Sequence, residues 1–360
     1  MAVQDIESFK VAMTAVYGPF DELTGDKVRN WIPPSSPGAG GHHGRYLWTD
    51  AFGVINFLTL YKETSMEHYL HLAKRLVYTV HNVLGRTREG SQRLPGATDD
   101  APLKGGLRIG KLTEAGADCD GQYHHYLTIW MFALNRVSVA TGDLTFNNLA
   151  IELAKAIHDH FVISDDVGNM RMVWKISTDM KDVLVPSEGH LDAATGFAIY
   201  RLLQNTAALY GADDDTILSK EIEDYAALML RPGKLAPTTD FLDLGMGLWM
   251  CHLCHEEPWA DKLSNQSLQM LRSHLGSAEG APLRRYKGLA FREFGAYLGA
   301  RCVGTDDELD AKIAALIKAR EKDTPHVDRD LKPISHVMYA SAVIPGAFRR
   351  DYFSNPWSRN

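Results

Sequence analysis

A unit of two helices recurs along this chain, and that repeat is the strongest constraint on its fold. Each unit has a long polar loop rich in Gly and Pro, an apolar helix, a tight turn and a second, amphipathic helix. The turns read YKETSMEHYLHLAKRL, VATGDLTFNNLAIELAKAI and YGADDDTILSKEIEDYAALM in the first three units. A Gly or Thr ends one helix and an Asp or Thr caps the next, which is the usual chemistry of helix ends. Repeats of this length indicate stacked helical hairpins.

Six long loops follow an opening helix at about 4–17. They lie at about 28–46, 86–119, 161–188, 231–240, 276–287 and 321–333. Apolar helices begin behind them, near RYLWTDAFG, DGQYHHYL, SEGHLDAATG, TDFLDLGMG, YKGLAFREFG and ISHVMYASA. Helices that are apolar nearly all round are buried, so we expect these six to form an inner ring with the amphipathic helices outside. Strand signals are almost absent, except for a short hairpin near Met170 to Trp174.

The repeat predicts an all-α fold, an (α/α)6 barrel of six hairpins that forms a single domain over residues 1–360. A chain of 360 residues that is 45% hydrophobic is long enough for two average domains, but it also suits one large barrel with a well-buried core. Another all-α solenoid or an open toroid is the alternative topology.

The charge pattern narrows the class of ligand. The chain has 38 basic and 45 acidic residues, a net charge of −7 and no basic run, so nucleic acid and anionic membranes have little support as partners. No apolar run approaches the roughly 20 residues that span a bilayer. The start, MAVQDIESFKVAMTAVYG, lacks the features of a signal peptide, so we expect a cytoplasmic protein that acts on a small molecule. The sequence does not indicate an oligomeric state.

Two further motifs resemble cofactor-binding patterns, but neither predicts a cofactor. The segment CHLCH lies inside an apolar helix without a second cysteine pair, so we expect neither haem nor zinc, and the four cysteines are expected to be reduced thiols. The loop GAGGHHG at 38–44 follows no strand and precedes no GK[ST], so we interpret it as a flap in which His42 or His43 can touch a ligand. No metal and no cofactor are predicted.

A barrel whose inner helices run the same way gathers their N-termini and the long loops at one end, and we expect the site there. The first inner helix brings Arg45, Tyr46, Trp48 and Asp50. Aromatic rings can stack on a pyranose while a carboxylate accepts hydrogen bonds from its hydroxyls. The alternative is an N-cap Asp beside packing aromatics.

The second inner helix begins with the densest polar cluster of the chain, DCDGQYHHYL, and its candidates are Asp120, Gln122, Tyr123 and His124. On a helix, Asp120, Tyr123 and His124 would share one face and address one ligand. The adjacent His124 and His125 point about 100° apart, so we expect only one of them to face the interior. The alternative makes Asp118 or Asp120 a helix cap and both histidines structural.

The remaining inner helices contribute one or two polar groups each. We expect Asp192 to face the interior and Asp240 to cap its helix, and we expect Arg292 and Glu293 not to be buried unpaired. The candidates from these four helices are Glu188, His190, Asp192, Asp243, Arg292, Glu293 and His336, with Tyr339 beside the last. Two carboxyl groups in a partly desolvated mouth can be driven apart in pKa, which glycoside hydrolysis requires.

The turn ATGD at 140–143 followed by LAIELAKAI, and the similar turn before HYLHLAKRL, resemble the six-hairpin glycosidase-like superfamily over nearly the whole chain. That superfamily includes unsaturated glucuronyl hydrolases and N-acylglucosamine 2-epimerases. The resemblance implies a carbohydrate-active enzyme, most simply a glycoside hydrolase, with Asp120 and Asp50 as the carboxyl groups that match by helix order. By resemblance to the epimerases, His190, His336 and His124 are acid–base candidates for an isomerase instead.

Two further alternatives stay open. The architecture also resembles lyases and dehydratase-isomerases that act on apolar small molecules, and the inner helices carry matching side chains, namely Trp130, Met131, Met246, Trp249 and Met250. The last alternative is a barrel that binds a ligand without turnover.

Overall fold

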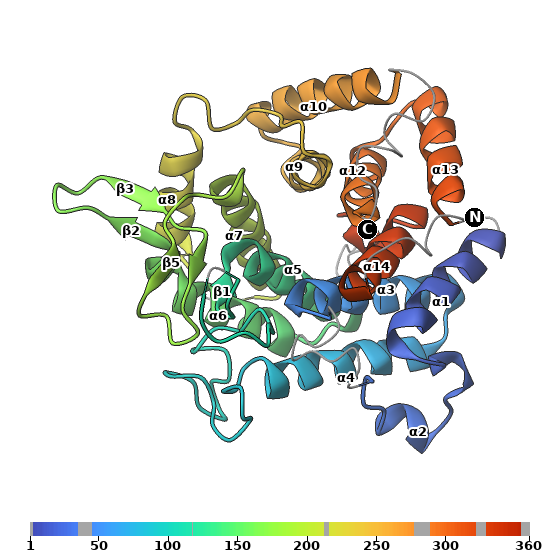
Figure 1. Ribbon diagram of the computed structural model, residues 1–360, viewed down its shortest axis with the longest axis horizontal. Coiled ribbons are helices and arrows are strands. Elements are labelled where there is room, and N and C mark those ends of the chain that lie inside the picture. Colours follow the sequence, from blue (N-terminus) through green and yellow to red (C-terminus); the bar gives the residue numbers. More distant parts are fainter. Residues whose placement is uncertain are drawn as a thin grey trace. The chain divides into compact units, whose positions relative to one another are not determined.

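The computed structural model describes residues 3–34, 45–116, 118–211, 216–276, 289–321 and 329–353. Internal contacts divide the chain into two compact units. Figure 1 labels the helices and strands along the chain. The first unit comprises Met1–Glu22 and Leu235–Tyr352, and the second comprises Leu23–Lys234 and Phe353–Asn360. The expectation of a single domain therefore stays a prediction. The predicted flap at 38–44, with His42 and His43, lies outside the described residues.

The second unit contains three helical hairpins in the order that the repeat predicts. They are α3 (Leu47–Thr64) with α4 (Glu67–Val83), α5 (His124–Thr141) with α6 (Thr145–Phe161), and α7 (Asp192–Leu209) with α8 (Ser219–Met229). A short helix, α2 (Asp26–Arg29), packs against α4. Of the three apolar helices, α5 packs on both α3 and α7, and α3 is buried from Leu47 to Leu60. The amphipathic α4 and α6 cover them, because each has one apolar face and one polar face.

The first unit repeats this arrangement with helices from both ends of the chain. Its pairs are α9 (Phe241–Leu253) with α10 (Pro258–Gly276), α12 (Ala290–Val303) with α13 (Asp307–Glu321), and α14 (Lys332–Val343) with α1 (Val3–Tyr17). Short 3-10 turns accompany them at η1 (Phe20–Glu22), η4 (Arg329–Leu331) and η5 (Gly346–Phe348). The opening helix predicted at about 4–17 is confirmed, and it is the partner of the last apolar helix.

Helix ends follow the expected chemistry in part. Gly142 ends α5 with φ 72°, the left-handed conformation that Gly adopts at a helix C-terminus. The Asp240 side chain accepts from the backbone N–H groups of Leu242 and Asp243, which confirms that it caps α9. In the turn between α3 and α4, however, the residue in the left-handed conformation is Ser65 and not Gly or Thr.

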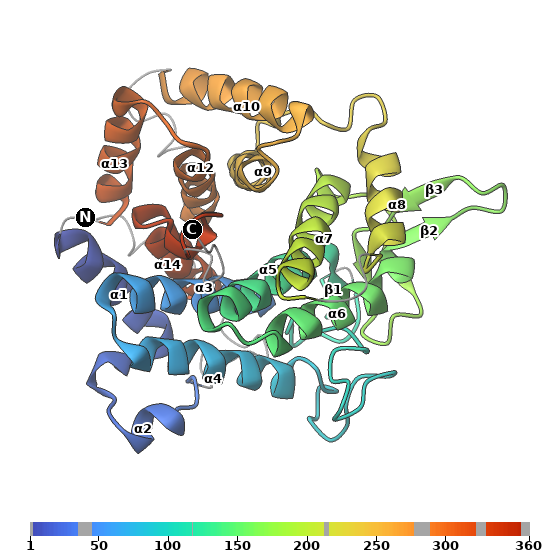
Figure 2. The same ribbon diagram turned by 180° about the vertical axis from the view of Figure 1, so that it is seen from behind.

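The strands found among the described residues are all short and belong to the second unit. The expected hairpin is confirmed as β2 (Val162–Ser164) paired with β3 (Met170–Met172), and Figure 2 shows it beside α8. A second, unpredicted sheet has the order β1-β4-β5, formed by β1 (Gln122–Tyr123), β4 (Lys175–Ile176) and β5 (Val183–Val185). Its antiparallel register places Tyr123 opposite Lys175. This sheet fixes the segment that precedes α5.

Candidate functional site

The N-terminal ends of α3, α5 and α7 meet in the second unit. The Trp48 ring, in the first turn of α3, lies 5.5 Å from the Tyr126 ring of α5, centroid to centroid. Nδ1 of His124, the first residue of α5, lies 4.0 Å from Oδ2 of Asp192, the first residue of α7. The expected gathering of inner-helix N-termini is thus observed for these three helices.

Five aromatic side chains group around these helix ends, and we call them the aromatic face: Trp48, Tyr123, His125, Tyr126 and Trp174. The Tyr123 and Trp174 rings lie 4.9 Å apart, and the His125 ring lies within 6 Å of each of the other four rings. All but the buried Trp48 are half-buried. An array of partly exposed rings is suited to stack on the apolar faces of a sugar.

The small sheet brings Trp174 to the aromatic face. Pairing of β1 with β4 places the residue before Lys175 beside the start of α5, where the Trp174 carbonyl accepts from His124 N at 3.3 Å. The Trp174 indole Nε1 then donates to Nδ1 of His125 over 3.0 Å. The sequence indicated a hairpin near Trp174 but did not single out Trp174, His125 or Tyr126 as site residues.

A charged pair lies at the edge of the aromatic face. The Lys111 ammonium pairs with the carboxylate of Asp118 and lies 5.8 Å from the centre of the Tyr123 ring. Burial favours the neutral amine of Lys111, but the hydrogen bond to Asp118 and the nearby charges of Tyr123, Asp118 and Tyr46 together outweigh it, so the pKa of Lys111 is raised. The Asp118 side chain is 86% exposed. It is therefore a carboxylate that a ligand on Tyr123 can reach.

A buried lysine supports the same ring from within. The Lys175 ammonium lies 5.2 Å from the centre of the Tyr123 ring, which suits a cation–π contact, and donates to the Cys119 carbonyl over 2.5 Å. Cys119, like the other three cysteines, is buried and free.

Asp120 is an anchor of the loop before α5 and not part of that helix. Its Oδ2 accepts from Arg108 at 2.7 Å and from Arg88 at 3.4 Å, while Oδ1 accepts from the backbone N–H groups of Gly110 and Lys111. The prediction that it shares a helix face with Tyr123 and His124 is wrong, because α5 begins only at His124 and Tyr123 lies in β1. Four hydrogen-bond donors on this buried carboxylate hold the loop in place.

Gln122 and Asp50 are likewise engaged by the protein. The Gln122 side chain donates to the carbonyls of Gly105 and Thr178 and accepts from Leu107 N, all within 3.1 Å. Asp50 is fully buried in α3 and pairs with Nε of Arg45 at 2.9 Å. The Arg45 guanidinium also donates to the Pro34 carbonyl. These contacts favour structural roles for Gln122, Asp50 and Arg45, which were predicted as ligand groups.

His124 faces the interior of the second unit and not the aromatic face. Its Nε2 lies 2.8 Å from the Tyr225 hydroxyl of α8, and the ring is fully buried. Burial lowers the pKa of His124 to about 3, with His125 and His158 adding smaller effects, so the ring is neutral. Asp192 beside it is 4% exposed. Of the two adjacent histidines, only His125 belongs to the aromatic face.

Two other candidates of the second unit lie before α7. Glu188 pairs with Lys234 at 2.7 Å, and His190 is exposed. Tyr46 directly precedes α3 and is half-buried.

The candidates of the first unit form their own pairs. Arg292 contacts the capping residue Asp240, and Glu293 makes a buried bidentate pair with Arg320 of α13, with N–O distances of 2.9 and 2.6 Å. The expectation that Arg292 and Glu293 are paired is confirmed. The Glu293 side chain is fully buried and pairs with Arg320, so it joins α12 to α13. Asp243 and His336 are half-buried, and burial lowers the pKa of His336.

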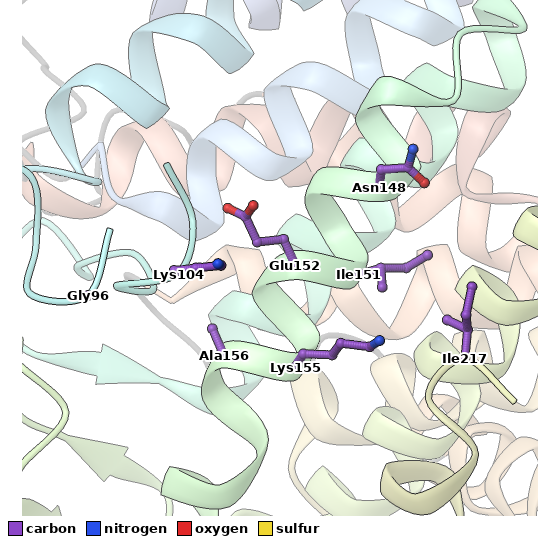
Figure 3. A pocket seen from close by; sticks show the side chains of 8 residues that line it. All are labelled: Gly96, Lys104, Asn148, Ile151, Glu152, Lys155, Ala156 and Ile217. Atoms are coloured by element: carbon purple, nitrogen blue, oxygen red, sulfur yellow. The ribbon is translucent and has the colours of Figure 1, made fainter. Parts of the chain in front are cut away.

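A pocket of about 630 Å³ opens on the outer helix α6 (Figure 3). It is lined by Gly96, Lys104, Asn148, Ile151, Glu152, Lys155, Ala156 and Ile217. Oε1 of Glu152 accepts from Leu103 N at 2.7 Å. The pocket includes no residue of the aromatic face.

Within the described ranges, no three His, Cys, Asp or Glu side chains are grouped so that they could hold a metal ion. The helices found in the same ranges include none with the length and apolar character to cross a membrane.

Comparisons with known proteins bear on the fold. No protein-family model matches the sequence, and no curated protein matches it. Among solved structures, the chain is similar to a glycoside hydrolase family 76 mannosidase from Bacteroides thetaiotaomicron VPI-5482. The identity is 11% and the TM-score 0.52, over 95% of this chain and 98% of that chain. At this identity the likeness shows the fold alone, and it confirms the predicted all-α, six-hairpin (α/α)6 class.

Proposed function

We propose that this chain is a carbohydrate-active enzyme, a glycoside hydrolase, that binds its sugar on the aromatic face. The observation that carries the proposal is the array of rings at the N-termini of α3 and α5, with Lys111 and Asp118 at its edge. Stacked rings beside charged groups suit a pyranose, whose faces are apolar and whose hydroxyls are polar. The fold shared with a family 76 mannosidase supports the same class of substrate.

Hydrolysis of a glycosidic bond needs two carboxyl groups, one as acid and one as base or nucleophile. Asp120 and Asp50 accept from arginines inside the protein, so we do not assign the proton transfer to them. Asp192 is buried beside His124, so we do not assign the proton transfer to it either. Asp118 is an exposed carboxylate paired with Lys111, whose ammonium lies 5.8 Å from the centre of the Tyr123 ring. We propose Asp118 as one of the two reacting carboxyl groups.

The histidine-based isomerase has less support. His124 is fully buried on Tyr225, and His190 is exposed in the loop before α7. With His124 enclosed, an acid–base pair would have to be built on the exposed His190 and on the half-buried His336, whose pKa is lowered by burial. We therefore favour hydrolysis, in which a new reducing end forms, over epimerisation, in which one carbon changes configuration.

The test is product analysis with mannan, mannotriose and other neutral oligosaccharides, using the wild-type chain and three variants. We expect new reducing ends, a KM raised about tenfold or more in Trp174→Ala, and a kcat lowered by about 10²-fold or more in Asp118→Asn. Tyr78→Ala is the control, because Tyr78 is an exposed aromatic residue on α4 outside the aromatic face. Absence of both turnover and binding with every sugar would overturn the proposal.

A further inference from the structure

The hydrogen bond between Trp174 and His125 fixes which nitrogen of His125 carries the proton. An indole N–H can only donate, so Nδ1 of His125, 3.0 Å from Nε1 of Trp174, must accept. An accepting nitrogen has no proton, and a neutral imidazole then carries its single proton on Nε2. Protonation of the ring would turn Nδ1 into a donor and break this bond.

The surroundings of His125 also hold it in the neutral form. The rings of Trp48, Tyr123, Tyr126 and Trp174 all lie within 6 Å of the His125 ring, centroid to centroid. Burial among them lowers the pKa of His125 to about 3.

Other titratable groups stand farther out around the aromatic face. Lys111 and Lys175 lie over the Tyr123 ring, and Asp118 pairs with Lys111. Tyr46 precedes α3, and His124 faces Tyr225. The hydrogen bond from Trp174 therefore sets the tautomer of His125.

We propose that His125 is a substrate-binding residue locked in one tautomer, whose Nε2–H donates to an acceptor oxygen of a sugar bound on the aromatic face. This inference rests on the proposed function and adds a specific contact to it. The His125 ring is half-buried, and within the described part of the chain no residue accepts from Nε2. A neutral donor among aromatic rings can recognise a hydroxyl, ring or glycosidic oxygen while the rings cover the apolar face of the sugar. His125 then orients the sugar and exchanges no proton in the reaction.

The tautomer can be measured without any sugar. In the full chain with isotope-labelled histidine, long-range nitrogen–proton spectra distinguish a protonated ring nitrogen from an accepting one, and His125→Gln identifies the signal. We expect Nε2 protonated and Nδ1 accepting from about pH 5 to about pH 8, with no titration near the ordinary pKa of about 6.5. In Trp174→Phe, which keeps a ring but has no donor, we expect the preference for one tautomer to weaken. Titration of His125 near pH 6.5, or a proton on Nδ1, would overturn the inference.

The contact itself is tested by binding of mannotriose, measured by calorimetry. His125→Phe keeps a ring without a donor, and we expect Kd to rise about tenfold. His125→Gln restores an N–H donor, and we expect it to recover part of that loss. An unchanged Kd in His125→Phe would refute the contact while leaving the aromatic face as the sugar site. Failure of mannotriose to bind the wild-type chain, with the tautomer as expected, would count against the sugar-binding role and leave the locked tautomer standing.

Discussion

The Arg108 guanidinium donates to Oδ2 of Asp120 over 2.7 Å, and both side chains are almost fully buried. This pair, with the second arginine Arg88, ties the loop between α4 and α5 to the segment that leads into the aromatic face. Removal of one partner from a buried ion pair leaves the other charge uncompensated, which costs about 3–5 kcal/mol.

We therefore expect Asp120→Asn to lower the free energy of unfolding by about 3–5 kcal/mol, measured by urea denaturation. The matched control is Asp99→Asn in the same loop. Asp99 pairs with Arg93 at 3.1 Å, but its side chain is 84% exposed, so we expect a loss of less than about 1 kcal/mol. If both variants were equally stable, the Arg108 pair would not anchor the loop.

Buried histidines make stability depend on pH. Burial lowers the pKa of His81, His124 and His125 to about 3, whereas all three take an ordinary pKa near 6.5 in the unfolded chain. The unfolded state then binds more protons at any pH between these values. Stability is complete above about pH 6.5 and falls as the pH drops toward 3, by up to about 1.4 kcal/mol per pH unit for each histidine.

At pH 5 we expect each of these histidines to have lowered the unfolding free energy by about 2 kcal/mol relative to pH 7. Urea unfolding at the two pH values measures the sum. His81→Asn removes one contribution and flattens the dependence, although it also loses the bond in which Trp130 donates to His81 at 3.2 Å. His160→Gln is the control, because His160 is exposed on α6. An equally steep dependence in His81→Asn would contradict this account.

The pair of Glu293 with Arg320 predicts a double-mutant result in the first unit. Both side chains are almost fully buried and share two hydrogen bonds. We expect Arg320→Met alone to cost about 3–5 kcal/mol, because it leaves the Glu293 carboxylate buried without its cation. Addition of Glu293→Leu should restore much of that stability, since apolar side chains can replace a buried ion pair at little cost. Additive losses in chemical denaturation would show that the two residues do not act together.

The helix pattern was predictable from the sequence, and the contacts of single polar groups were not. The spacing of apolar residues predicts that α3 is buried and that α4 is amphipathic. The Gly at 142 predicts the end of α5, because Gly commonly follows the last residue of a helix. In contrast, β1 and β4 have two residues each, too few for a periodic signal. Without that sheet, nothing in the sequence brings Trp174 to the aromatic face.

The roles of the polar candidates depend on where β1 ends and α5 begins, and on the course of the preceding loop. Asp120 was placed on a helix face because DCDGQYHHYL suits a helix start, but β1 delays the helix until His124. That delay also decides which of two adjacent histidines joins the aromatic face. The partner of Asp120, Arg108, lies in an irregular loop whose course no residue pattern indicates.

Glycines inside α9 and α12 give a last prediction. A Gly inside a helix normally costs about 1 kcal/mol relative to Ala, so Gly→Ala at an open position should be neutral or stabilising. Here the two helices touch through their backbones: a Cβ on Gly245 would overlap the carbonyl of Gly295, and a Cβ on Gly299 would overlap the carbonyl of Gly245.

Backbone atoms cannot turn aside as a flexible side chain can, so the helices would have to separate. We expect Gly245→Ala to destabilise the chain by about 1–3 kcal/mol in thermal or chemical denaturation, as overpacking does. Gly276→Ala is the matched control at the end of α10, where the added Cβ meets nothing within 4 Å, and it should leave stability unchanged or slightly higher. Equal effects of the two substitutions would mean that close packing of α9 on α12 is not what requires glycine at 245.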